Sequence, residues 1–523
     1  MDYNKEYQRW TDCKDLDPSL KAELLSMNEK EKEDAFYMNL EFGTAGMRGI
    51  LGAGTNRMNI YTIRKANVGF AKYVLGLPEG KERGVAIGYD NRHMSYKFAI
   101  ESAKVLATYG IKSYIFESLR PTPELSFAVR YLKCAGGIMI TASHNPKEYN
   151  GYKAYWDDGS QLVPPHDKNV IDEVKKVQVS DIKFEGVPEM ITILGKDFDK
   201  KYLDKVKTLS LSPEAIQKEH DLKIVFTPLH GTTYELVPAS LRNWGFTNIH
   251  TVPEQSIPDG DFPTVASANP EEPAAFKMAL DLARKIDADL AMACDPDGDR
   301  IGIAVKNDAG EWTLLNGNQT NIIFTEYIIR RKKELNQLKG GEYTVKTIVT
   351  TELIKDIAEK NHIICYDVYT GFKWIADVIR KEGGEKFIGG GEESFGYMPG
   401  AFTRDKDGVS ATSLMAEIAA WVKMQNKTLY SFLKEIYAKY GFSQERMIYI
   451  VRKGLSGAQE IKAMMEEFRH NTPKEINHSP VVLKKDYLSL EATNLQTGEK
   501  THLNFETKSD VLQFFLADGS KIS

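Results

Sequence analysis

Short apolar segments alternate with amphipathic ones along most of this chain, and that alternation limits its fold more than any other feature. Residues 84–89 (GVAIGY) are typical of a buried strand, and residues 95–109 carry apolar side chains at helical spacing. The same order of strand and helix begins again near residue 222 and near residue 345. Strands that alternate with helices pair mainly in parallel, so the sequence predicts three similar α/β domains with mixed or parallel sheets.

The pattern changes after about residue 441. A strand is expected at residues 446–451, a helix at 458–468 and another strand at 511–516, which together predict a smaller C-terminal α+β domain. Residues 517–520 (ADGS) are typical of a hairpin turn, but only Lys521, Ile522 and Ser523 follow them, so we expect this last domain to be incomplete. The predicted domains are residues 1–209, 210–318, 319–441 and 442–523.

The composition argues against several classes of protein. A net charge of −5 over 523 residues, with no strongly basic arm, argues against nucleic-acid binding. A run of about 18 apolar residues is absent and the N-terminus is polar, so neither a membrane span nor a signal peptide is predicted. The four cysteines lie far apart without a C-x-x-C pair, which indicates a reducing compartment and a cytoplasmic protein.

An unusual polar loop follows one strand in each predicted α/β domain, at the edge of the sheet where ligands gather. The first loop is Thr141–Pro146 (TASHNP), which contains Ser143 and His144. Taken alone, Ser143 would be a turn residue that bonds nearby backbone. A serine hydrolase fits poorly, because the chain lacks a G-x-S-x-G elbow there and a neighbouring His144 on an extended chain would point away from Ser143.

The second loop, Asp295–Arg300 (DPDGDR), places three carboxylates within five residues. Such carboxylates repel one another, and a hard cation with oxygen ligands would balance them. The glycine position does not match an EF-hand, and Mg²⁺ is the favoured ion. The alternative interpretation is an acidic surface turn, which the directly preceding apolar strand makes less favourable.

The third loop, Gly389–Gly396 (GGGEESFG), combines glycines with Glu392 and Ser394. Glycines let a backbone approach a ligand closely, and the polar side chains could bind sugar hydroxyls. A flexible loop is an equally good interpretation of this segment alone. Residues 404–407 (RDKD) follow and suit either an exposed charged turn or a phosphate clamp.

Together these loops resemble the α-D-phosphohexomutase family, and within it the phosphoglucomutase/phosphomannomutase type. The resemblance depends mostly on TASHNP at 141–146, DPDGDR at 295–300 and GEESFG at 391–396. Shorter agreements are GTAGMRG at 43–49, NGYK at 150–153, FTPLHG at 226–231, YTGFKW at 369–374 and RDKDG at 404–408. They occur in order through nearly the whole chain, which makes chance similarity a poor explanation.

The resemblance implies four domains around a central cleft and a role for each matched residue. Ser143 would carry a phosphoryl group, and its oxygen would bind Mg²⁺ together with Asp295, Asp297 and Asp299. Arg48 and Lys153 would lie beside the transferring phosphoryl group. The residues implied in substrate binding are Thr370, Gly371, Glu392, Ser394, Lys406 and Arg300, the last of which flanks the metal loop.

The activity implied by the resemblance is the reversible interconversion of glucose 1-phosphate and glucose 6-phosphate. Phosphoserine 143 would form glucose 1,6-bisphosphate, the intermediate and activator, and then take back the other phosphoryl group. Lys153 could move the hydroxyl proton if burial and Arg48 lower its pKa, and His144, whose usual pKa is near neutral, is a second candidate. His144 could equally serve only to orient the loop.

Other functions stay open on the sequence alone. A phosphopentomutase or phosphomannomutase would use the same scaffold, and a non-catalytic sugar-phosphate-binding protein would share the pocket. The partners expected are small-molecule sugar phosphates, with no nucleic acid and no membrane, in a monomer or a dimer. The family's fourth loop, RPSGTEPK-like, binds the non-reacting phosphate and has no counterpart in this sequence. Its absence agrees with the incomplete last domain expected above.

Overall fold

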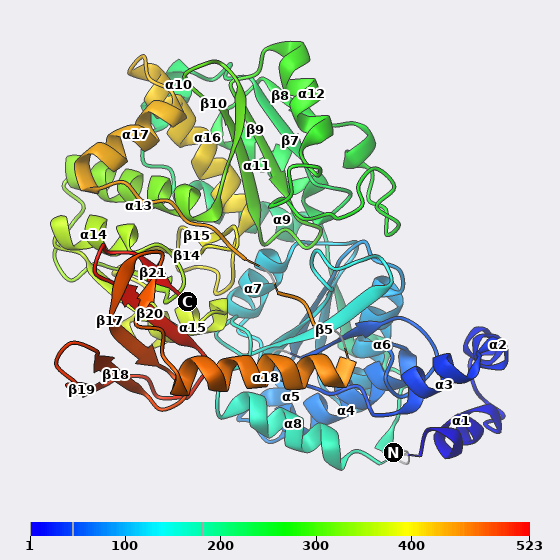
Figure 1. Cartoon of the computed structure of the whole chain (residues 1–523). Coiled ribbons are helices and arrows are strands. Elements are labelled where there is room, and N and C mark those ends of the chain that lie inside the picture. Colours follow the sequence, from blue (N-terminus) through cyan, green and yellow to red (C-terminus); the bar gives the residue numbers. More distant parts are fainter. Residues whose placement is uncertain (1, 44–45, 179–180, 449, 453) are drawn as a thin grey trace. The chain divides into compact units, whose positions relative to one another are not determined.

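A computed structural model describes the chain except for residues 1, 44–45, 179–180, 449 and 453 (Figure 1). The chain divides into two compact units, residues 1–443 and 444–523. The first unit contains three sheets and the second contains one. Each unit is described by itself.

The first sheet has a parallel core that is extended at one edge by two strands in antiparallel pairing. Its strand order is β1-β5-β4-β2-β3-β6. The strands are β1 (Met47–Ile50), β2 (Val85–Tyr89), β3 (Ser113–Phe116), β4 (Gly136–Ile140), β5 (Tyr149–Tyr155) and β6 (Ile191–Leu194). Strands β4, β2, β3 and β6 run parallel, whereas β5 pairs antiparallel with both β4 and β1.

The second and third sheets repeat this plan with fewer strands. The second has the order β11-β10-β9-β7-β8 and the third β13-β12-β14-β15. The strands of the second are β7 (Ile224–Thr227), β8 (Ile249–Thr251), β9 (Leu290–Cys294), β10 (Ile301–Lys306) and β11 (Trp312–Leu315). Those of the third are β12 (Tyr343–Thr347), β13 (Ile364–Val368), β14 (Phe387–Glu392) and β15 (Gly396–Met398).

In each of the three sheets, a parallel core strand turns back into an antiparallel neighbour. The pairs are β4 with β5, β9 with β10 and β14 with β15. The segments between them are residues 141–148, 295–300 and 393–395. The three polar loops singled out in the sequence therefore occupy the same place in three copies of one plan.

Helices cover both faces of the sheets. Alternate residues of β2 show this, because Val85 and Ile87 belong to one apolar cluster and Ala86 belongs to another. The cluster that contains Ala86 also includes core residues of the second sheet and of the helices near the third, so it joins the three domains. This shared core explains why residues 1–443 form one unit.

The helices of the first unit match the predicted alternation. They are α1 (Tyr3–Thr11), α2 (Pro18–Ser26), α3 (Glu29–Phe36), α4 (Ile60–Leu75), α5 (Gly80–Arg83), α6 (Ser95–Thr108), α7 (Thr122–Tyr131), α8 (His166–Lys176), α9 (Lys196–Lys207), α10 (Pro213–Lys218), α11 (Leu236–Trp244), α12 (Lys277–Ile286), α13 (Gly317–Glu334), α14 (Leu353–Lys360), α15 (Phe372–Glu382), α16 (Gly408–Met424) and α17 (Leu429–Tyr440). Short 3₁₀ helices span Pro188–Met190, Thr232–Tyr234 and Glu254–Ser256.

The second unit packs one helix and an antiparallel sheet. Helix α18 (Gly454–His470) precedes strands β16 (Glu475–Ile476), β17 (Ser479–Asp486), β18 (Glu491–Asn494), β19 (Lys500–His502), β20 (Leu512–Leu516) and β21 (Lys521–Ile522). Strands β20 and β21 pair antiparallel across the predicted turn at residues 517–520. The predicted α+β tail is therefore confirmed for residues 454–523.

One predicted strand is wrong. Among the described residues of the segment 446–451, none forms a strand, and residue 449 lies outside the described residues. Met447 and Ile448 are exposed, as are Ile450 and Val451. A strand requires a partner for its backbone groups, which an apolar pattern alone does not supply.

The fold class is otherwise as predicted, with three α/β domains followed by an α+β region. The domain boundaries at residues 209, 318 and 441 stay predictions.

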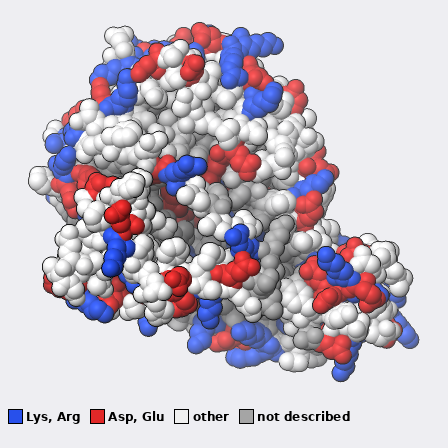
Figure 2. All heavy atoms as spheres, in the orientation of Figure 1, with Lys and Arg blue, Asp and Glu red and all other residues white. Residues whose placement is uncertain are grey.

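Among the described residues, no helix is both long and apolar enough to cross a membrane. On the face drawn in Figure 2, basic and acidic side chains are interspersed, in keeping with the small net charge.

Candidate active site

Ser143 lies at the first of the three loops, just beyond β4, and is almost fully buried. Its backbone has φ +51°, a left-handed conformation that turns the chain sharply. Its Oγ donates to Oδ2 of Asp295 at 2.9 Å and lies 3.2 Å from Nδ1 of His144. The expectation that His144 would point away from Ser143 is therefore wrong, because the chain is not extended at this serine.

Sequence reasoning missed the arginine that holds this loop. The guanidinium of Arg92, fully buried in its side chain, donates to four backbone carbonyls, those of Ser143, Asn145, Pro146 and Tyr149. Asp90 lies 3.4 Å from Nε of Arg92. A single planar cation thus satisfies a loop whose carbonyls would otherwise be buried without partners.

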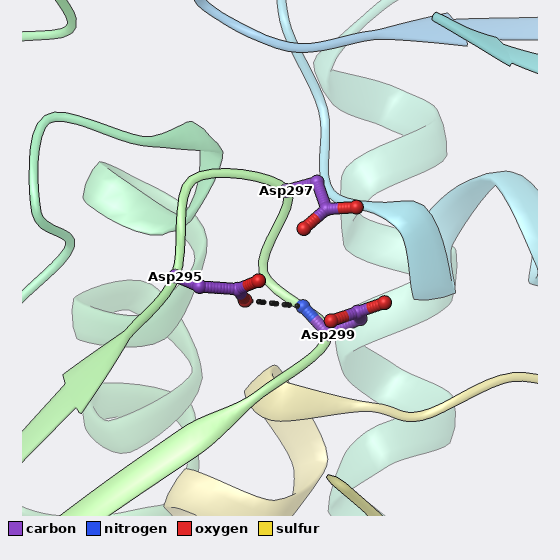
Figure 3. A group of neighbouring side chains, drawn as sticks. All are labelled: Asp295, Asp297 and Asp299. Carbon is purple, nitrogen blue, oxygen red and sulfur yellow. Dashed lines mark hydrogen bonds between the residues drawn. The ribbon is translucent and has the colours of Figure 1, made fainter. Parts of the chain in front are cut away.

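The second loop brings together the side chains of Asp295, Asp297 and Asp299 (Figure 3). All three are buried, and one oxygen of each lies within 4.8 Å of the others. The Asp299 amide donates to Oδ1 of Asp295 at 3.1 Å, the bond dashed in Figure 3. The curl of the loop therefore brings one oxygen of each carboxylate close to the others.

These residues fit a hard cation. Oδ1 of Asp297 and both carboxylate oxygens of Asp299 are buried without a hydrogen-bond partner among the described residues. Thr122, which sequence reasoning also missed, donates its amide to the Asp297 carbonyl at 2.8 Å and its hydroxyl to Asp297 Oδ2 at 3.2 Å. Buried oxygens held in this way are the ligands that Mg²⁺ prefers.

The carboxylates differ in their protonation. Burial, with the nearby charges of Asp297 and Asp299, holds the pKa of Asp295 well above its usual value. Burial would also raise the pKa of Asp297, but Lys153, Lys406 and a hydrogen bond with Asp295 together outweigh it, so this pKa lies below its usual value. Asp297 is therefore a better ionised anchor than Asp295 for a cation or a lysine.

Two lysines from different domains reach the triad. Nζ of Lys153, on β5, lies 2.8 Å from Oδ2 of Asp297 and 3.8 Å from Oδ2 of Asp299. Nζ of Lys406 lies 3.3 Å from the same Asp299 oxygen. Burial alone would lower the pKa of Lys153, but Asp297 and Asp299 outweigh it and raise that pKa. A lowered pKa, the condition under which Lys153 was expected to move the hydroxyl proton, is therefore not met.

His144 is neutral near pH 7. Burial, with a smaller contribution from the positive charge of Arg300, lowers the pKa of His144 to about 4. A near-neutral pKa was expected, so this expectation is also wrong. Arg48 lies on β1, where its Nη1 donates to Oδ1 of Asn145 at 2.9 Å. Residues 44–45 of the motif that contains Arg48 lie outside the described residues.

The third loop is shorter than predicted, because β14 continues through the glycines to Glu392. A Cβ on Gly391 would lie 1.8 Å from Oδ1 of Asn321, and one on Gly389 would lie 2.3 Å from the hydroxyl oxygen of Tyr397. These glycines therefore make room for neighbouring elements, whereas the sequence suggested close approach to a ligand.

Glu392 connects this strand to the turn before α15. Its Oε1 accepts a hydrogen bond of 2.6 Å from the amide of Gly371. Burial raises the pKa of Glu392, and the nearby charge of Lys406 limits the rise. Thr370 and Gly371 are thereby held next to a carboxylate, an arrangement that suits recognition of hydroxyl groups.

A pocket of about 450 Å³ collects most of the predicted site residues. Its wall includes Arg48, Ser143, His144, Lys153, Asp299, Arg300, Thr370, Gly371, Glu392 and Lys406. Asp295 and Asp297 are fully buried and do not line it, and neither does Ser394. The wall also includes residues that were not among the predicted site residues, namely Gly46, Met47, Gln161, Phe372 and Lys373. The volume is within the usual range for small-ligand sites.

Comparison with known proteins identifies the family of this chain. Three phosphoglucomutase/phosphomannomutase family models match the chain, for α/β/α domain I at residues 39–180, domain II at 200–310 and domain III at 316–440. The chain belongs to the phosphoglucomutase/phosphomannomutase family. The resemblance predicted from the three loops is confirmed.

Relatives within this family cover nearly the whole chain. A phosphoglucomutase from Staphylococcus aureus (strain bovine RF122 / ET3-1) is 38% identical over 493 residues, which is 94% of this chain and 88% of the relative. A putative phosphomannomutase from Thermus thermophilus has a similar structure, with a TM-score of 0.63, 25% identity, and coverage of 78% of this chain and 85% of its own. The protein is therefore an enzyme of the mutase class of isomerases.

A more distant structure supports the fold alone. The pp63/parafusin phosphoglucomutase of Paramecium, in its open form, matches with a TM-score of 0.65 and 17% identity. The match covers 93% of this chain and 87% of that one. The non-catalytic alternative is set aside by the family membership, whereas the roles of individual residues are a matter for the proposal below.

Proposed function

We propose that this phosphohexomutase reversibly interconverts glucose 1-phosphate and glucose 6-phosphate, with a phosphoryl group carried on Ser143 and glucose 1,6-bisphosphate as intermediate and activator. Relatives at 37–38% identity that are named phosphoglucomutase support glucose as the sugar. The structural relative named putative phosphomannomutase keeps a mannose phosphate as the second candidate. The four free cysteines support a cytoplasmic enzyme.

The environment of Ser143 carries the proposal. Its hydroxyl is at the pocket wall, while its backbone is fixed by Arg92 and by Thr141, whose Oγ1 accepts a 2.8 Å bond from the Ser143 amide. A serine held so rigidly, beside carboxylates and within reach of an imidazole, suits repeated gain and loss of a phosphoryl group.

Each transfer breaks one P–O bond and forms another. In the first step, the free hydroxyl of the sugar phosphate takes the phosphoryl group from Ser143, and the bond between phosphorus and Oγ breaks. The proton that the sugar hydroxyl loses ends on Oγ of Ser143, and the product is the bisphosphate. In the second, Oγ of Ser143 attacks the other phosphoryl group of the bisphosphate, and the bond between that phosphorus and the sugar oxygen breaks. Oγ loses its proton, and the sugar oxygen gains one to become the free hydroxyl of the product. The neutral imidazole of His144, 3.2 Å from Oγ, can accept the proton that Oγ loses.

Positive charge in the pocket has a separate task. Lys153 and Arg48 would offset the charge on the transferring phosphoryl oxygens, since phosphoryl transfer depends mainly on positioning and charge stabilisation. Asp295, Asp297 and Asp299, with the phosphoserine oxygen, would hold Mg²⁺. When bound, that ion would act as a Lewis acid on the phosphoryl oxygens.

Recognition of the sugar would fall to the third domain. Glu392, held by the amide of Gly371, is placed to accept from hydroxyl groups. Thr370 and Lys406 share the same pocket wall, as does Arg300, which is anchored by Glu271. We assign Ser394 to the sugar contacts on its motif alone.

The test combines intact mass with turnover. We expect one phosphate on the purified enzyme, located at Ser143, and a loss of several orders of magnitude in turnover for Ser143→Ala with the fold retained. Ser102→Ala is the matched control, since Ser102 is also buried and, within the described part of the chain, its side chain bonds only to Asn67 and Phe98, in α4 and α6. Near-normal turnover of Ser143→Ala would refute the phosphoserine. Comparison of glucose, mannose and ribose 1-phosphates decides the sugar.

A further inference from the structure

The loop that carries Lys406 is held in place by residues from elsewhere in the fold. It runs from Arg404 to Gly408, between β15 and α16. Its anchors include the Arg404 amide to Ser126 Oγ (2.8 Å), the Tyr155 hydroxyl to Asp405 Oδ2 (2.7 Å), the Tyr202 hydroxyl to Asp407 Oδ1 (2.8 Å) and the Gly408 amide to the Gly298 carbonyl (3.1 Å). Ser126 and Tyr155 lie in the first matched domain, whereas the loop lies in the third.

Tyr155 shares its strand face with Lys153. The two residues are two positions apart on β5, so their side chains point to the same side. Lys153 reaches Asp297 and Asp299, while Tyr155 reaches Asp405, the residue before Lys406. One face of one strand therefore carries Lys153 and also bonds to the residue before Lys406, so it contacts the surroundings of both lysines that pair with Asp299.

The carboxylate of Asp405 connects Tyr155 to the backbone of Lys406. Its Oδ2 accepts from Tyr155 and from Nε2 of Gln161 at 3.1 Å, and its Oδ1 accepts from the Lys406 amide at 2.9 Å. Both oxygens are thus committed, and the Lys406 backbone is bonded directly to the carboxylate that Tyr155 orients. The side chain of Lys406 then passes over Gly396, where an added Cβ would lie 2.1 Å from Lys406 Cδ.

We propose that Tyr155 and Asp405 are positioning residues that place Lys406 in the pocket and so couple the first domain to the third during phosphoryl transfer. This inference rests on the proposed function, in which Lys406 contacts the sugar phosphate. The competing explanation is that Tyr155 only fills the core, because its ring belongs to the large apolar cluster of the first unit. The hydroxyl and the ring can be tested separately.

Tyr155→Phe removes the hydroxyl and keeps the ring. Tyr152→Phe is the matched control: Tyr152 lies on the same strand, is equally buried, and donates to Oδ1 of Asn67 at 3.2 Å on the opposite face. A hydrogen bond to a charged group is worth roughly tenfold or more in an equilibrium constant, so we expect kcat/KM to fall about tenfold for Tyr155→Phe. Tyr152→Phe should show the same small loss of Tm with kcat/KM unchanged.

A second comparison tests the route through Asp405. In an Asp405→Ala background, adding Tyr155→Phe should cost nothing further, because the hydroxyl has lost the carboxylate it orients. Equal kcat/KM for the Tyr155→Phe and Tyr152→Phe enzymes would overturn the inference, as would a full additional loss in the Asp405→Ala background. Wild-type enzyme that turns over none of the sugar phosphates would instead overturn the proposed function, and this inference with it.

Discussion

Replacement of Asp407 by asparagine should stabilise the protein at neutral pH. Asp407 caps α16, where its Oδ1 accepts from the Ser410 amide at 2.9 Å and from the Tyr202 hydroxyl at 2.8 Å. Its Oδ2 is buried and has no hydrogen-bond partner among the described residues. Asparagine has the same shape and can keep both bonds at Oδ1. It leaves one polar atom unpaired, as aspartate does, but removes the buried charge.

The magnitude follows from the pKa. Burial raises the pKa of Asp407 from 3.8 to about 6, despite the hydrogen bonds that oppose the rise. A carboxyl whose pKa is higher in the folded chain contributes stability below its unfolded pKa and loses that contribution as the pH rises through its folded pKa. Roughly two pKa units correspond to about 3 kcal/mol at pH 8, and to about half of that at pH 5.

The assay is calorimetry of wild type and Asp407→Asn at pH 5 and pH 8. With an unfolding entropy of about 2 cal/mol/K per residue, a unit spanning residues 1–443 that melts cooperatively has a total of about 0.9 kcal/mol/K. The variant should therefore melt about 3 °C above wild type at pH 8 and about half as far above it at pH 5. A less stable variant at pH 8, or an equal gap at both pH values, would refute the reasoning.

The control is a second N-cap aspartate whose pKa is shifted in the opposite direction. Asp17 caps α2 without a buried charge, because it is partly exposed and its pKa is lowered, chiefly by the hydroxyl of Ser19. A carboxyl with a lowered folded pKa contributes stability above its unfolded pKa, so this contribution is present at pH 8. Asp17→Asn should therefore melt at or slightly below the wild-type temperature at pH 8.

Two further predictions concern the site and its support. Asp297→Asn should raise the Mg²⁺ concentration needed for half-maximal activity and for half-maximal thermal stabilisation by at least about tenfold, since it removes a carboxylate ligand whose pKa is lowered; an unchanged Mg²⁺ titration in both assays would contradict the assignment. Gly391→Ala should destabilise the protein by about 1–3 kcal/mol, because its Cβ would meet Asn321 and Gly396. Gly76→Ala, whose Cβ would meet nothing closer than 3.3 Å, should have a much smaller effect in the same melting assay.

Periodic apolar spacing was enough to predict most strands and helices of the first unit, because each element buries a regular face. It also placed Ser143 and the Asp295 loop at strand ends, since an apolar run that stops at polar residues marks where a buried strand leaves the sheet. The same reasoning failed at residues 446–451, where the pattern is right but no partner strand supplies hydrogen bonds. It also predicted a strand shorter than β14, because glycine is not typical of strands. The glycines are needed there because neighbouring side chains leave no room for a Cβ.

Long-range contacts explain what the sequence could not reveal about the site. Arg92 and Thr122 are far in sequence from the loops they hold. Nothing in their local sequence indicates that Arg92 bonds to the carbonyls of the Ser143 loop or that Thr122 bonds to Asp297. The sign of the Lys153 pKa shift depends on two carboxylates from another domain. The sequence did suggest that Lys153 is buried. The effect of burial on its pKa is outweighed by the charges of Asp297 and Asp299, which only folding brings close to Lys153.

The hairpin plan common to the three sheets gives the site its rigidity. Each of the three loops is connected to a strand at both ends, and the longest is also held by the hydrogen bonds from Arg92 to its carbonyls. Small displacements of the loops would therefore raise the energy of the folded chain. Because the nucleophile, the carboxylates and the sugar-facing groups sit on separate sheets, their mutual distances depend on how the domains pack and not on the loops themselves. The contacts that cross between domains, such as Tyr155 with Asp405 and Thr122 with Asp297, are therefore where substitutions remote from the substrate should change catalysis most.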